Sequence, residues 1–180
     1  MEAITARRVC LIGAECTGKT RLAEDLARHF GTVWVPEYAR EYAVHVARPL
    51  TYMDVTPIAE GQIALFELPT SDLRPPTSLI ILDTDLISTV VYSRHHYGHC
   101  PEWIEREARK RRADLYLWLD IDVPWVADPA RDSGERRDQL HDEFREALEE
   151  FEAKFVEISG SWDERFARAV QAMEATRLVV

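Results

Sequence analysis

Eight consecutive residues near the start of the chain have the types and spacing of a loop that binds nucleotide phosphates. They fit the pattern G-x-x-x-x-G-K-[ST] and are Gly13, Ala14, Glu15, Cys16, Thr17, Gly18, Lys19 and Thr20. In such a loop the backbone N–H groups converge on one anion, the lysine reaches the β and γ phosphates of ATP, and the threonine hydroxyl binds Mg²⁺. An apolar run precedes the pattern and a helical segment follows it, which favours a phosphate site over a plain turn with a solvated lysine. We expect Lys19 to face solvent when no ligand is bound.

A second group of polar residues follows an apolar run, residues 79–82, and consists of Asp83, Thr84 and Asp85. Ligands of open α/β sheets bind at the carboxyl ends of the strands, so Asp83 is placed to face the phosphate loop. There it would bind Mg²⁺ through water or orient an acceptor hydroxyl. Either acid could instead cap a helix that begins at Leu86, and for Asp85 capping and substrate contact are equally good interpretations.

A third group, residues 36–42, follows another short strand. Glu37 and Arg40 are close enough along the chain to converge on one ligand, and Tyr38 and Tyr42, four apart on a helix, can line one side of a pocket. The alternative is a solvated first helical turn in which Glu37 complements the helix dipole.

A long stretch of weak periodicity, about residues 122–139, is typical of a functional loop, and we expect it to be a lid. Its arginines, among them Arg131 and Arg136, would close over the transferring phosphate and neutralise its charge. A solvated charge run is an equally good interpretation of Arg136 and of Arg137. Adenine is expected at the turn that follows the last strand, residues 159–162, and Trp162 is the last residue of that turn.

The elements that must position these residues alternate along the chain. Short apolar runs predict buried strands, and helical periodicity separates them. The expected strands are residues 9–12, 33–35, 79–82, 115–119 and 155–158, and the expected helices are residues 19–30, 40–47, 57–67, 86–96, 102–111, 139–154 and 162–176. This order predicts an α/β fold with a central parallel sheet of about five strands and helices on both faces. Residues 1–180 are expected to form a single domain.

The bulk composition restricts the partners. With 22 Lys and Arg against 32 Asp and Glu, the formal charge is -10, which disfavours binding to nucleic acid or to an anionic membrane surface. The three cysteines have no metal-like spacing, so neither disulfides nor structural zinc are expected. Reduced thiols are typical of the cytoplasm, and we expect the protein to be located there. The sequence leaves the oligomeric state open.

Four blocks together resemble the ribosylnicotinamide kinase domain of NadR-type proteins, an AAA-like P-loop kinase family. The blocks are residues 13–20, residues 37–42, residues 83–85, and residues 124–128 with Arg131. The resemblance implies a three-layer P-loop kinase fold and transfer of the ATP γ-phosphate to the 5′-hydroxyl of nicotinamide riboside, giving nicotinamide mononucleotide. Cys16 stands where the family usually has serine. Larger members carry an adenylyltransferase domain, and sometimes a DNA-binding domain, before the kinase; the chain as given begins at the kinase's first strand and is expected to stop at the mononucleotide.

The needs of phosphoryl transfer, which are an aligned hydroxyl, a metal ion and positive charge, suggest a role for each of these residues. Lys19 and the loop bind the phosphates, Thr20 and Asp83 hold Mg²⁺, and Arg131 contacts phosphate. Glu37 is the first candidate for orienting the acceptor hydroxyl and taking its proton, with Asp83 second. The substrate would contact Glu37, Tyr38, Arg40, Tyr42, Asp83, Asp85, Trp125 and Asp128.

Other acceptors and another class of protein stay open. Aromatic and carboxylate side chains suit the cationic ring of nicotinamide riboside, but they would also suit thiamine, and nucleosides remain candidates. A regulatory P-loop ATPase is the alternative from a different class. A GTPase is disfavoured because the sequence has no N-K-x-D guanine motif.

Overall fold

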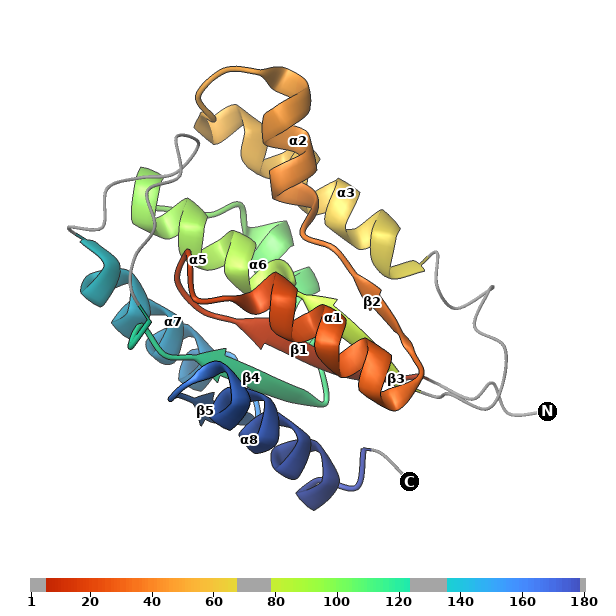
Figure 1. Cartoon of the computed structure of the whole chain (residues 1–180). Helices are drawn as coiled ribbons and strands as arrows, with labels where there is room; N and C mark the ends of the chain where they lie inside the picture. Colours follow the sequence, from red (N-terminus) through yellow and green to blue (C-terminus); the bar gives the residue numbers. More distant parts are fainter. Residues whose placement is uncertain (1–5, 68–78, 124–135, 179–180) are drawn as a thin grey trace.

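A computed structural model describes residues 6–67, 79–123 and 136–178. Five parallel strands form one sheet in the order β2-β3-β1-β4-β5 (Figure 1). The strands are β1 (Arg7–Ile12), β2 (Val33–Val35), β3 (Leu79–Asp83), β4 (Leu115–Leu119) and β5 (Phe155–Ile158). All five agree with the predicted strands to within two residues, because a parallel sheet covered on both faces requires continuous apolar runs.

Helices cover both faces of the sheet. They are α1 (Lys19–Phe30), α2 (Tyr38–Val46), α3 (Val55–Glu67), α5 (Leu86–Tyr97), α6 (Glu102–Lys110), α7 (Arg137–Glu150) and α8 (Trp162–Ala175), with a 3₁₀ turn η1 (Tyr52–Asp54). Helices α1 and α8 pack on one face, and α3, α5, α6 and α7 pack on the other (Figure 1). Among the helices of the described ranges, none is long and apolar enough to span a membrane.

Alternating strand residues divide the core into two layers. Val9 and Leu11 of β1 pack with α1 and α8, whereas Cys10 and Ile12 pack with the helices of the opposite face. Three helices begin two residues earlier than expected, α2 at Tyr38, α3 at Val55 and α7 at Arg137. The helix expected over residues 139–154 also ends early, at Glu150, because Glu152 adopts a left-handed conformation with φ 51°.

Candidate active site

The phosphate loop leaves β1 at the carboxyl edge of the sheet and leads into α1. Two of its glycines are required by close approach of neighbouring atoms. At Gly13, with φ 140°, a Cβ would lie 2.8 Å from the carbonyl oxygen of Leu119, and at Gly18, with φ 87°, it would lie 2.3 Å from the ring of Trp162. Side chains at these positions would therefore be strained and would clash, so the glycines allow the loop to wrap tightly.

Lys19 is buried, and the expectation that it faces solvent is wrong. Its Nζ donates hydrogen bonds to the carbonyl oxygens of Gly13, at 2.9 Å, and Ala14, at 2.8 Å. The loop carbonyls at the end of β1 attract the ammonium group, and only 8% of the residue remains exposed. The cation is thus already held across the loop, where a phosphate of ATP would lie.

Thr20 and Asp83 form the polar pair beneath the loop. The Thr20 hydroxyl donates to Asp83 Oδ2 at 2.6 Å, while Asp83 Oδ1 is buried without a hydrogen-bond partner among the described residues. Burial raises the pKa of Asp83, and the hydrogen bond from Thr20 and the charge of Lys19 oppose this rise. A buried carboxylate oxygen without a partner, beside a hydroxyl, fits the oxygen donors that Mg²⁺ prefers.

Glu37 and Arg40 come from the neighbouring strand end, where β2 leads into α2. Arg40 Nε lies 3.9 Å from Glu37 Oε2. The charges of both side chains shift the pKa of Asp83. The negative charge of Glu37 raises this pKa, and the positive charge of Arg40 lowers it. The structure therefore brings Glu37, Arg40 and Asp83 into one electrostatic neighbourhood, as expected for adjacent strands that end at the same edge.

Tyr38 packs closely on α3. A Cβ at Gly61 would lie 2.0 Å from the Tyr38 ring, and the Tyr38 N–H donates to Gln62 Oε1 at 2.8 Å. The ring centroids of Tyr38 and Tyr42 are 6.2 Å apart. The two tyrosines thus lie together, as their spacing predicts.

Tyr42 is anchored by Asp54, a residue that the sequence analysis missed. The Tyr42 hydroxyl donates to Asp54 Oδ1 at 2.9 Å, and Arg48 donates to both carboxylate oxygens of Asp54 at 2.7 and 2.8 Å. Hydrogen bonds from Arg48 are the main cause that lowers the pKa of the buried Asp54. Thr51 and Asp54 form a capping box, a T-x-x-D signal that could have identified this anchor.

Asp85 is the N-cap of α5. Its carboxylate accepts hydrogen bonds from the Ile87 N–H at 2.9 Å and from the Tyr116 hydroxyl at 2.5 Å, and burial raises its pKa to about 6. Of the two interpretations left open, the geometry supports capping.

Arg165, on α8, is a second residue that the sequence analysis missed. It is fully buried, and its guanidinium donates to the carbonyl oxygens of Thr17, Asp120 and Gly160 at 2.9–3.0 Å and to the Asp122 carboxylate. One side chain thus connects the phosphate loop to the ends of β4 and β5. An arginine within the apolar stripe of a helix was the available signal.

Trp162 lies at the start of α8, against Gly18. The Arg21 guanidinium lies 5.0 Å from the centre of its ring, and 41% of the residue is exposed. The ring borders a pocket of about 430 Å³ between α1 and α8. The structure thus places an exposed aromatic surface beside the phosphate loop, at the turn where adenine was expected.

Of the two arginines at the start of α7, Arg137 contacts the phosphate loop. It donates to the carbonyl oxygens of Val123, at 2.9 Å, and Cys16, at 3.4 Å, whereas Arg136 is exposed. Trp125, Asp128 and Arg131, together with most of the expected lid, lie outside the described residues.

Comparisons with known proteins agree with this architecture. The model of a family described as "AAA domain" matches residues 8–165, and the chain therefore belongs to that family. The "Trifunctional NAD biosynthesis/regulator protein NadR" of Escherichia coli (strain K12) is 29% identical over 172 residues, which cover 92% of this chain and 41% of that protein. The corresponding NadR of Salmonella typhimurium is 28% identical over 175 residues, covering 93% of this chain and 42% of that protein.

Solved structures give the same fold. A crystal structure of NadR protein in complex with NR superposes with a TM-score of 0.78 at 26% identity, covering 98% of this chain and 53% of that one. Thymidylate kinase from Candida albicans, at 14% identity, reaches a TM-score of 0.70. These findings confirm the α/β P-loop kinase fold and the resemblance to NadR-type proteins. The chain spans about half or less of the NadR chains that it matches.

Proposed function

We propose that this member of the AAA-domain family is an ATP-dependent kinase that phosphorylates the 5′-hydroxyl of nicotinamide riboside and so forms nicotinamide mononucleotide. The observation that carries the proposal is the cluster at the carboxyl edge of the sheet, where Thr20 bonds to Asp83 next to the phosphate loop and the charges of Glu37 and Arg40 act on the pKa of Asp83. The similarity to NadR, whose structure contains NR and whose name refers to NAD biosynthesis, supports this acceptor.

The phosphate loop supplies most of what phosphoryl transfer needs, which is positioning and positive charge. The N–H groups of the loop and of the first turn of α1 would bind the β and γ phosphates, and Lys19 would move from its loop carbonyls onto them. Thr20 and Asp83 would hold Mg²⁺, which neutralises charge on the phosphates when bound. Trp162 is the proposed contact for adenine.

Glu37 is the proposed group that orients the acceptor hydroxyl and accepts its proton. Asp83 is the weaker candidate, because one of its oxygens already accepts from Thr20 and the other would bind Mg²⁺ in this proposal. Arg40 would contact substrate, and Tyr38 and Tyr42 would contact the cationic ring through their π faces. Arg131, Trp125 and Asp128 remain proposed contacts from the lid, residues 122–139.

The test is acceptor-dependent release of ADP, measured with nicotinamide riboside, thiamine and uridine. We expect turnover to be highest with nicotinamide riboside. A preference for thiamine or uridine would change the proposed acceptor substrate but leave the proposed kinase activity standing. ADP release that needs no acceptor would indicate a regulatory ATPase instead.

Glu37→Gln tests the role of the carboxylate, and Glu41→Gln, which changes an exposed acid in the first turn of α2, is its control. Loss of a general base should lower kcat by roughly 10²–10⁴-fold. A raised KM with unchanged kcat would make Glu37 a binding residue only. Normal kinetics in Glu37→Gln would move the base to Asp83.

The proposal also covers the setting of the reaction. We expect a kinase of a small molecule, acting in the cytoplasm as one domain, and neither nucleic acid nor a membrane as its partner. The charge of -10 supports this expectation because anionic surfaces would repel the chain.

A further inference from the structure

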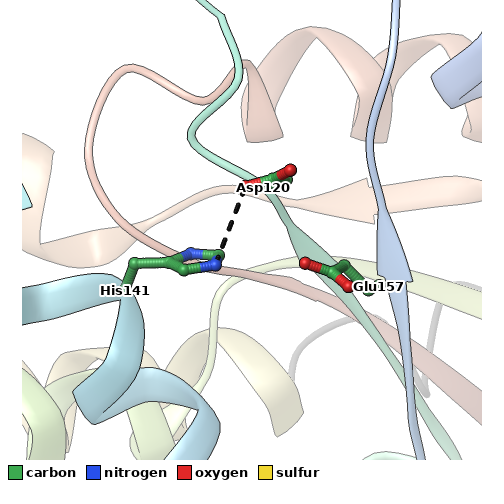
Figure 2. Close-up of side chains that lie close together, drawn as sticks. All are labelled: Asp120, His141 and Glu157. Carbon is green, nitrogen blue, oxygen red and sulfur yellow. Dashed lines mark ion pairs between the residues drawn. The ribbon is translucent and has the colours of Figure 1, made fainter. Parts of the chain in front are cut away.

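Three side chains with metal-binding atoms converge at the edge of the sheet formed by β4 and β5. Asp120 directly follows β4, Glu157 lies on β5, and His141 lies on α7, which covers this face (Figure 2). One ligand atom from each residue lies within 4.8 Å of the others, and His141 Nε2 is 3.7 Å from Asp120 Oδ1. Trp118 and Glu157 are register partners, so the donors share the face on which α7 packs.

His141 lacks the hydrogen bonds that a largely buried imidazole normally makes. Its side chain is 13% exposed, and its ring stacks on Trp118 with centroids 4.2 Å apart and planes at 18°. Nδ1 is buried and has no hydrogen-bond partner among the described residues, and 3.7 Å is too long for a hydrogen bond from Nε2 to Asp120. The stacking therefore fixes the ring with Nε2 directed at the two carboxylates, as Figure 2 shows.

Among the residues that the structure describes, neither carboxylate has a lysine or arginine partner. Within the described part of the chain, the Asp120 carboxylate accepts a hydrogen bond only from the Ile121 N–H, and its one ion-pair contact is His141. The Glu157 side chain has no hydrogen bond or ion pair with any described residue. Two neighbouring acids without Lys or Arg repel each other, and a divalent cation would remove that repulsion.

We propose that Asp120, His141 and Glu157 bind a first-row transition-metal dication of the Zn²⁺ type, with water in the remaining position. An imidazole with two carboxylates suits Zn²⁺, Co²⁺ or Ni²⁺, whereas Mg²⁺ and Ca²⁺ select oxygen donors. Zinc bonds of about 2.0–2.2 Å in a tetrahedral site bring ligand atoms to about 3.3–3.6 Å from one another, so the exposed Glu157 side chain would rotate toward the other two ligands on binding. The site is separate from Thr20 and Asp83 and does not depend on the proposed kinase reaction.

An ion at this site would join α7 to the sheet edge. Helix α7 begins at Arg137, which contacts the carbonyl oxygen of Cys16 in the phosphate loop, and the carbonyl oxygen of Asp120 accepts a hydrogen bond from Arg165. The metal would thus stabilise the folded chain, because it binds a constellation that only the fold assembles.

Metal binding by the full chain, stripped of metal with a chelator and free of nucleotide, tests the proposal. Titration with ZnCl₂ in a calorimeter should show one ion per chain, and the Tm should rise with zinc concentration. Glu157→Gln should weaken binding by roughly tenfold or more, as loss of a ligand requires, while Glu174→Gln, which removes an exposed acid on α8, should bind as the wild type does.

CoCl₂ provides the second readout, since imidazole ligation changes the visible absorption of Co²⁺. His141→Ala should lose this spectrum, and His45→Ala, which removes an exposed histidine on α2, should keep it. If His141→Ala does not fold, the zinc affinity of Glu157→Gln decides the test. Equal affinity in Glu157→Gln and wild type, or binding that disappears in Asp83→Asn, would overturn the proposal, the latter by placing the ion at the phosphate loop.

Discussion

Replacing Arg165 by methionine removes a buried guanidinium that four acceptors share. Its hydrogen bonds reach the carbonyl oxygens of Thr17, Asp120 and Gly160, and it pairs with the Asp122 carboxylate. Methionine fills similar space but donates nothing, so three carbonyls and one charge lose their partner.

The expected cost follows from how much water can reach these groups. Removing one partner of a buried ion pair costs about 3–5 kcal/mol, because the remaining charge stays unpaired. The Asp122 side chain is 34% exposed and can be resolvated in part, so we expect the lower end, about 3–4 kcal/mol. For a chain of this size that loss lowers the Tm by roughly 6–16 °C.

Urea and thermal unfolding of Arg165→Met, Arg165→Lys and Arg168→Met measure this cost. Arg168 lies on the same helix but is exposed, and within the described ranges its hydrogen bond is to the Ser159 hydroxyl, so its loss should change stability by less than about 0.5 kcal/mol. Arg165→Lys keeps the positive charge but loses the planar guanidinium and its several N–H donors, so its stability should lie between those of the wild type and Arg165→Met.

A functional readout separates positioning from bulk stability. Since Arg165 binds the Thr17 carbonyl, its loss should raise the KM for ATP at temperatures where the variant is fully folded, with little change in the KM for the acceptor. Stability within about 1 kcal/mol of wild type for Arg165→Met, or an unchanged KM for ATP, would refute this account of the residue.

Three further expectations follow from the contacts of single residues. Lys19→Ala should abolish phosphoryl transfer while costing only about 1–2 kcal/mol of stability, because Nζ bonds to two loop carbonyls; near-normal turnover at saturating ATP would exclude the phosphate-loop assignment. Gly61→Ala should raise the KM for the acceptor and leave that for ATP unchanged, since its Cβ would lie 2.0 Å from the Tyr38 ring; equal effects on both would show that the damage is general. Burial raises the pKa of Asp85 to about 6, so the folded chain holds a proton that the unfolded chain releases near pH 4, and this group's contribution to stability, up to about 3 kcal/mol, is full below about pH 4 and lost as the pH rises through 6. Urea unfolding of wild type and Asp85→Asn across that range should show a shallower decline in the variant, and parallel curves would contradict the raised pKa.

The sheet could be predicted because its pattern is local. Residues 115–119 are a continuous buried run, as a strand covered on both faces must be, and residues 155–158 at the sheet edge keep three apolar residues around the exposed Glu157, so both strands have the predicted bounds. The shared location of the phosphate loop and Asp83 could also be predicted, because parallel strands have their carboxyl ends at the same edge of the sheet. The 3₁₀ turn at Tyr52–Asp54 was missed because it depends on a capping box and on Arg48, which bonds to Asp54 across a bend of the chain.

The contacts beneath the phosphate loop depend instead on distant partners that no local pattern marks. Arginine is usually a surface residue, and only tertiary packing shows that Arg165 is enclosed whereas Arg168, three positions later, is exposed. Arg136 and Arg137 are equivalent in sequence, yet Arg137 is half-buried and donates to the Cys16 carbonyl oxygen whereas Arg136 is exposed. Lys19 illustrates the same point. The motif predicts that its ammonium group binds phosphate, but not where that group lies when no phosphate is bound. The carbonyl oxygens at the end of β1 offer its ammonium the nearest acceptors, and these hydrogen bonds hold the cation within the loop until a phosphate replaces them.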